Sequence, residues 1–134
     1  MADFFDDLPD DQKTLAKKLR AFVRRHDKNV EESEGDYMKM PAVRFCEAGV
    51  DKYAIAKTKR GLTFHTMVMY AFPDIGVLAK KTLSGVKLQK GCINIIRPAT
   101  LSLDAFEDFI AAGAKKDYTG VVEYYREKKK EKRR

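Results

Sequence analysis

Apolar residues near the start of the chain recur every three or four positions, the spacing of one face of an α-helix. The pattern predicts a helix that starts at Pro9 and Asp10, with Asp10 and Asp11 stabilised by the positive end of the helix dipole. The predicted buried stripe consists of Leu15, Leu19, Phe22 and Val23. The basic side chains between these positions occupy the rest of the helix surface.

From residue 29 to residue 70 the apolar period changes to two, which indicates antiparallel strands. Pro41 within this region marks a bulge, a strand start or a sheet edge. Turns are expected at residues 33–36, 47–51 and 59–61, where glycine interrupts the alternation. The clearest strand covers residues 62–70, with Leu62, Phe64, Thr66, Val68 and Tyr70 on the core side and Thr63, His65, Met67 and Met69 on the other side.

Helical spacing returns in the second half of the chain. It predicts one helix over residues 73–83 and a second that follows a cap at Ser102. A third helix is predicted in the terminal segment as far as Arg126, and the chain beyond it is expected to fray. A last strand is predicted from Cys92 to Ile96, and the period of two places Cys92 and Asn94 on one side, opposite Ile93 and Ile95.

This order of elements predicts an α+β fold, an antiparallel sheet of about five strands with helices packed on one face. Residues 1–118 are expected to form a single domain, and residues 119–134 a basic C-terminal helix or tail. At 134 residues the chain is long enough to bury one core without disulfides or a structural metal.

The two cysteines lack CxxC spacing, no secretion signal precedes them, and no apolar run approaches the roughly 20 residues that span a bilayer. We therefore expect a soluble cytoplasmic protein with free thiols and no membrane partner. The net charge of +7 is concentrated at the end, because residues 126–134 carry +5 and the rest of the chain +2. Arg126 to Arg134 thus offer weak, nonspecific binding of nucleic acid or other polyanions as one possible role.

Three blocks, at residues 37–45, 53–64 and 87–110, resemble the YdhG-like domain family in order and spacing. The departures are an inserted Met38, Gln89 in place of a glycine, and Ile95 in place of an aromatic residue. The residues that match the family pattern are Tyr37, Met40, Pro41, Lys59, Lys90, Gly91, Cys92, Ile93 and Asn94. The resemblance covers about residues 10–116 and implies a small α+β fold of secretion-chaperone-like architecture.

The resemblance implies little about activity. One branch of the family is described as frataxin-like iron chaperones that deliver iron for iron–sulfur cluster or haem assembly, so iron is a possible ligand. Acidic residues in two segments, 3–11 and 31–36, offer oxygen ligands for it, although helix capping and solvation also explain them. No His and Cys cluster with transition-metal spacing is present.

Two further readings concern the block around Cys92. If Thr63 and His65 share a sheet face with Cys92 and Asn94, a Cys-His-Asn arrangement for thiol catalysis becomes possible, although a strand cysteine is more often an inert apolar residue. Alternatively, the sheet is a ligand platform, with basic residues that either bind an anion or simply solubilise an exposed face: Lys39, Arg44, Lys57, Lys59, Arg60, Lys87 and Lys90.

These observations favour a binding or carrier module over an enzyme, with a small anionic ligand or a protein as partner. The candidate ligand-binding residues are Tyr37, Lys39, Met40, Pro41, Lys59, Lys90, Gly91, Cys92 and Asn94. Within this set, Lys90 and Asn94 are expected to matter at least as much as the Cys92 thiol.

Overall fold

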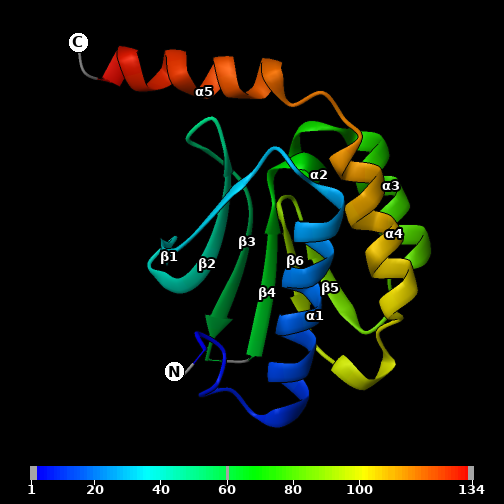
Figure 1. The fold of residues 1–134 in the computed structure, drawn as a ribbon. Helices are drawn as coiled ribbons and strands as arrows, with labels where there is room; N and C mark the ends of the chain where they lie inside the picture. The colour runs from blue at the N-terminus through cyan, green and yellow to red at the C-terminus, as the bar shows by residue number, and fades with distance from the viewer. Residues whose placement is uncertain (1–2, 60, 133–134) are drawn as a thin grey trace.

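The computed structural model describes residues 3–59 and 61–132, which form an α+β fold around one antiparallel sheet (Figure 1). The sheet has six strands in the order β1-β2-β3-β4-β6-β5. The strands are β1 (Glu31–Tyr37), β2 (Met40–Glu47), β3 (Val50–Thr58), β4 (Gly61–Thr66), β5 (Val86–Gln89) and β6 (Cys92–Ile95). The predicted fold class is confirmed, with one strand more than expected.

The helices cover one face of the sheet and one of its ends (Figure 1). They are α1 (Asp10–His26), α2 (Met67–Ala71), α3 (Pro73–Thr82), α4 (Leu103–Ala114) and α5 (Thr119–Lys132), with a 3-10 turn η1 at Pro98–Thr100. The predicted stripe of α1 is buried, and Ser102 caps α4 by accepting a hydrogen bond from the Ala105 amide at 3.2 Å. Pro73 is in the first turn of α3, as predicted.

The hydrophobic core lies between this helical layer and the sheet. Phe64 of β4 lies at its centre, with its ring edge-on to that of Phe106 of α4 at a centroid distance of 5.3 Å. Ile55, Phe64 and Ile93 are fully buried and come from three adjacent strands, which shows that alternate residues of the central strands face the helices. The other residues of these strands form the opposite face of the sheet, called here the open face.

Three predictions are wrong, and one strand was not predicted. The chain leaves the sheet after Thr66 and not after Tyr70, because the Thr66 hydroxyl accepts a hydrogen bond from the Met69 amide and starts α2. Residues 33–36 are not a turn but part of the polar edge strand β1, and the first hairpin turns instead at Met38 and Lys39. The short strand β5 was not expected, and helix α5 continues past Arg126 as far as Lys132.

Pro41 is the second residue of β2, which agrees with the predicted strand start. The turn expected at 47–51 joins β2 to β3. The turn expected at 59–61 falls between the end of β3 and the start of β4, and Arg60 within it lies outside the described residues. In the first of these, Ala48 and Gly49 both have positive φ, the backbone that a two-residue hairpin turn of type I′ requires.

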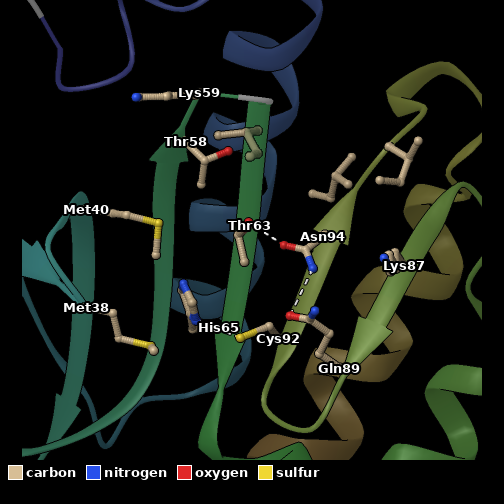
Figure 2. A pocket seen from close by; sticks show the side chains of 13 residues that line it. Met38, Met40, Thr58, Lys59, Thr63, His65, Lys87, Gln89, Cys92 and Asn94 are labelled. Carbon is tan, nitrogen blue, oxygen red and sulfur yellow. Dashed lines mark hydrogen bonds between the residues drawn. The ribbon is translucent and has the colours of Figure 1, made fainter.

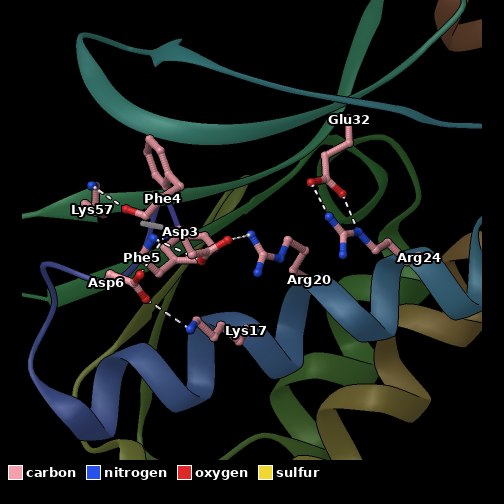
Figure 3. Close-up of polar contacts among 9 residues, drawn as sticks. All are labelled: Asp3, Phe4, Phe5, Asp6, Lys17, Arg20, Arg24, Glu32 and Lys57. Carbon is pink, nitrogen blue, oxygen red and sulfur yellow. Dashed lines mark hydrogen bonds and ion pairs between the residues drawn. The ribbon is translucent and has the colours of Figure 1, made fainter. Parts of the chain in front are cut away.

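The N-terminal segment, residues 3–8, is a strap that packs against α1 and β3 (Figure 3). Phe5 is 0% exposed and belongs to the core. Asp3 binds Arg20 at 2.9 Å and Asp6 binds Lys17 at 3.1 Å, both on α1, whereas the Phe4 carbonyl accepts a hydrogen bond from Lys57 of β3. The sequence suggested that these aspartates cap a helix or are solvated. Asp3 and Asp6 instead form ion pairs that hold the strap against α1.

Candidate functional site

The open face of the sheet carries two rows of paired residues that cross β2, β3, β4, β6 and β5. The strand register defines the first row as Ala42, Ala56, Thr63, Asn94 and Lys87. The second row contains Arg44, Ala54, His65, Cys92 and Gln89. Thr63, His65, Cys92 and Asn94 thus share one face, as the thiol reading required.

Cys92 and His65 are direct partners in the second row. Their Sγ and Nδ1 atoms lie 3.1 Å apart, within hydrogen-bonding distance for sulfur. His65 is only 3% exposed, and its second ring nitrogen, Nε2, has no hydrogen-bond partner among the residues that the structure describes. The pair therefore leaves one buried nitrogen unsatisfied.

Burial sets the protonation of this pair. It raises the pKa of the Cys92 thiol and lowers the pKa of the His65 imidazole, so both groups are neutral near pH 7. A catalytic cysteine needs the opposite arrangement, a thiolate stabilised by an imidazolium or another cation. The geometry brings the thiol and the imidazole together, but the local environment does not activate the sulfur.

Asn94 does not complete a Cys-His-Asn arrangement. Its side-chain oxygen accepts a hydrogen bond from the Thr63 hydroxyl at 2.7 Å, and its amide nitrogen donates to Gln89 at 3.4 Å (Figure 2). Asn94 therefore forms its hydrogen bonds within the sheet, to Thr63 and Gln89, and not to His65. The two rows together are called here the floor.

The first hairpin forms a wall above this floor. Alanines at 42, 54 and 56 leave room on the sheet, and Tyr37 and Met40 pack over them. The Tyr37 ring lies 4.5 Å from the His65 ring, centroid to centroid, and burial raises the pKa of Tyr37. At the turn, Met38 and Lys39 both adopt positive φ, a backbone that asparagine and glycine adopt more readily.

Floor and wall enclose a pocket of about 450 Å³, within the usual range for small-molecule sites. The pocket is lined by Met38, Met40, Thr58, Lys59, Leu62, Thr63, His65, Lys87, Gln89, Cys92, Asn94, Ile95 and Ile96. Figure 2 shows Lys59 beside the end of β3, Lys87 on β5, and the two methionines on the side of the first hairpin. We call this the open-face pocket.

The charge of the open-face pocket has one sign. Lys59 and Lys87 line it, both are exposed, and neither has an ion-pair partner among the described residues. No aspartate or glutamate is among the described residues that line it. The pocket therefore presents a positive rim above a neutral polar floor.

The predicted ligand residues separate into two groups in the structure. Met40, Lys59, Cys92 and Asn94 line the open-face pocket, and Tyr37 packs on the His65 ring. Lys39 and Pro41 flank the pocket without lining it. Lys90 and Gly91 also do not line it, because they lie in the β5–β6 turn. There the Gly91 carbonyl accepts a hydrogen bond from the Thr66 amide.

Several lining residues were absent from the predicted ligand-binding set: Met38, Thr63, His65, Lys87 and Gln89. The sequence indicates Lys87 only as a basic residue of the possible ligand platform, and Thr63 and His65 only in the possible thiol arrangement. Period-two alternation placed Thr63 and His65 opposite the core, and it would have placed Lys87 and Gln89 there too had β5 been recognised. Nothing in the sequence signalled Met38, because its position depends on a two-residue turn.

Several acidic residues of the two segments that suggested iron binding form ion pairs with basic side chains. Lys57 binds Asp7 at 3.1 Å. Arg24 donates two hydrogen bonds of 2.6 Å to Glu32 (Figure 3). In the described part of the chain, no three side chains of His, Cys, Asp or Glu gather as they would around a metal ion. His26, near the end of α1, lies 2.7 Å from Glu107.

Helix α5 presents the described part of the basic tail at one end of the sheet (Figure 1). Arg126 donates a hydrogen bond to the Ala48 carbonyl in the β2–β3 turn, and Lys128 lies over the Tyr124 ring. Arg133 and Arg134 fall outside the described residues. None of the helices that the structure describes combines the length and apolar character needed to cross a bilayer.

Comparison of the chain with protein-family models, with curated proteins and with solved structures gives no match. Membership of the YdhG-like family therefore stays a prediction from the three sequence blocks, and the function must be argued from the open-face pocket itself.

Proposed function

We propose that this protein is a binding or carrier module that holds a small anionic ligand in the open-face pocket. The observation that carries the proposal is that Lys59 and Lys87 line the pocket and neither has an ion-pair partner among the described residues. The described lining also contains no carboxylate. Opposite charge on the ligand would supply the missing partners, because charge-assisted hydrogen bonds are stronger than neutral ones.

The floor supports the same ligand chemistry. At the centre of the first row, Thr63 and Asn94 are polar but uncharged. The Asn94 amide makes only a long hydrogen bond of 3.4 Å to Gln89, which a bound acceptor can replace. Binding, and not covalent chemistry, also agrees with a thiol whose pKa is raised by burial. The resemblance to the YdhG-like family, one branch of which is described as iron chaperones, agrees with a carrier role but does not indicate an anionic ligand.

The test is a titration of isotope-labelled protein with three anions, inorganic phosphate, citrate and benzoate, followed by amide NMR. We expect at least one of them to shift the amides of Thr63, His65 and Asn94 in a saturable manner. The double variant Lys59→Glu/Lys87→Glu should bind about tenfold or more weakly, because a hydrogen bond to a charged group contributes roughly 1.5–3 kcal/mol.

The matched control is Lys80→Glu/Lys81→Glu, which makes the same change of charge on the exposed side of α3, away from the open-face pocket. This variant should bind the anion as the unmodified protein does. Equal weakening in both variants would show a general charge effect, and no saturable shift with any of the three anions at millimolar concentration would overturn the proposal.

A further inference from the structure

The unsatisfied nitrogen of His65 is the least explained polar atom of the open-face pocket. Its Nε2 is buried without a partner among the described residues, whereas Nδ1 already lies 3.1 Å from Cys92. Leaving a buried polar atom unpaired costs roughly 1–3 kcal/mol, so the atom calls for a partner such as a water molecule, an ion or a ligand. Neither the anion-binding rim nor the core packing uses this atom.

The donors around His65 are soft. Met38 and Met40 line the same pocket, and Figure 2 shows both thioether side chains extending from the first hairpin towards the side where His65 lies. Met38 is 70% exposed, so its thioether is accessible from solvent. Thioether sulfur and imidazole nitrogen together suit Cu(I), whereas Mg²⁺, Ca²⁺ and Mn²⁺ prefer oxygen ligands.

We propose that this end of the open-face pocket is a site for a soft monovalent ion, Cu(I), held by His65 Nε2 and the sulfur atoms of Met38 and Met40. All three ligands are neutral, and no carboxylate is among the described residues that line the pocket, so an ion of low charge is favoured. Cys92 contacts the other ring nitrogen. When Nε2 binds the ion, Nδ1 carries the proton and donates a hydrogen bond to the Cys92 sulfur. Acceptors in this position usually fix the tautomer and orientation of a metal-bound histidine.

The proposed ion site is separate from the lysines. Lys59 follows the end of β3 and Lys87 comes from β5, whereas Met38 and Met40 belong to the first hairpin. The copper proposal therefore does not depend on anion binding, and each can fail without the other. Lys59→Glu/Lys87→Glu should bind Cu(I) at least as well as the unmodified protein.

The experiment is an anaerobic titration of the full chain with Cu(I), in competition with the chelator bicinchoninate. We expect one ion per chain, and at least tenfold weaker binding in Met40→Leu and in His65→Phe. Leucine keeps the approximate size of methionine without the sulfur. Met67→Leu, which changes a half-buried methionine outside the open-face pocket, is the matched control and should leave the affinity unchanged.

A second measurement keeps the test decisive if His65→Phe folds poorly. The redox-inert ion Ag(I), added to the unmodified protein, should shift the methyl resonances of Met38 and Met40 and leave those of Met67 and Met69 in place. Shifts at Met67 and Met69 as large as those at Met38 and Met40, or no shift at any of these four residues, would overturn the proposal.

The two cysteines supply the main competing explanation, since thiols bind Cu(I) without any built site. Cys46→Ser/Cys92→Ser should retain one bound ion with a modest loss of affinity. Loss of all binding in this variant, with binding retained in Met40→Leu, would assign the ion to the thiols and overturn the proposal. Zn²⁺ binding as tight as that of Cu(I) would do the same, because zinc does not favour thioether ligands.

Discussion

At the scale of single residues, Cys92 shows how position and reactivity can diverge. The strand register places its sulfur beside an imidazole, which is the first requirement of a thiol enzyme. Burial then acts against the second requirement, because it raises the pKa of the thiol and lowers that of His65. The pair therefore consists of two neutral groups that order the floor of the open-face pocket.

This protonation state predicts slow alkylation of Cys92. A thiol with a raised pKa is ionised to a smaller extent at neutral pH than an ordinary thiol, and the thiolate is the form that reacts. In metal-free protein at pH 7, Cys92 should react with iodoacetamide severalfold more slowly than the same cysteine in urea-unfolded chain, as measured by mass spectrometry of its peptide.

Cys46 provides an internal comparison, because burial and a hydrogen bond to Asp51 also raise the pKa of its thiol. Both cysteines should gain reactivity only as the pH approaches and passes the usual range of a thiol. A Cys92 that reacts faster in the folded than in the unfolded protein would contradict the neutral pair and reopen the enzyme hypothesis.

At the scale of elements, an irregularity in the β2–β3 pairing buries a charge. The register shifts at Phe45 and Cys46, which leaves Lys52 of β3 as an additional residue, 1% exposed. Its ammonium lies 2.8 Å from both Asp27, at the end of α1, and Glu47 of β2. Asp27 also accepts a hydrogen bond of 2.9 Å from the Tyr53 hydroxyl, so this cluster joins α1 to the sheet.

We expect Lys52→Met to lower the free energy of unfolding by about 3–5 kcal/mol, because it leaves buried carboxylates without their cation. Lys80→Met, at an exposed position of α3, should change it by less than about 0.5 kcal/mol. Urea unfolding measures both. Adding Asp27→Asn to Lys52→Met should recover part of the loss, and a fully additive double variant would contradict the coupling of the two residues.

The elements also differ in how far the sequence could predict them. Helices α1 and α4 are confirmed because a long apolar stripe with a defined start has few alternative structures. Strand β1 has no apolar alternation to detect, since it is an edge strand of mostly exposed polar residues, and β5 has only four residues. The segment after Thr66 looked like a strand because both sides of it are apolar, and a single capping hydroxyl redirects it into α2.

The candidate site was predictable to the same limited extent. Period two correctly put Thr63 and His65 on one side of their strand, and Cys92 and Asn94 on one side of theirs. The pairing of β4 with β6 could not be derived, because β5 lies between them in sequence but not in the sheet. The match of His65 to Cys92 depends on that long-range register.

At the scale of the whole molecule, the strap at residues 3–8 closes the end of the core beneath α1. Arg20 forms an ion pair with Asp3 and also lies 5.2 Å from the centroid of the Phe5 ring, so it contacts the strap through both its charge and its planar face. The pKa of Asp3 is lowered, chiefly by its hydrogen bond with Arg20. This contribution to stability is present at neutral pH and is lost as the pH falls through the lowered pKa.

Phe5→Ala should therefore destabilise the entire domain by about 3–5 kcal/mol, the usual cost of removing a buried phenylalanine ring. Phe4→Ala is the matched control, because Phe4 is only partly buried under Lys57 and should cost distinctly less. Thermal and urea unfolding report both values. Equal, small losses in the two variants would show that the strap is not part of the cooperative unit.

The open-face pocket takes its floor and its wall from different kinds of structure. The floor is made by central strands whose other side forms the hydrophobic core, so most substitutions there also disturb the core. The wall is the turn of the first hairpin, residues 37–40, four consecutive positions at one edge of the sheet. Ligand preference can therefore change, in evolution or in a library of variants, through the exposed turn residues Met38 and Lys39, whereas Tyr37 and Met40 also pack on the sheet.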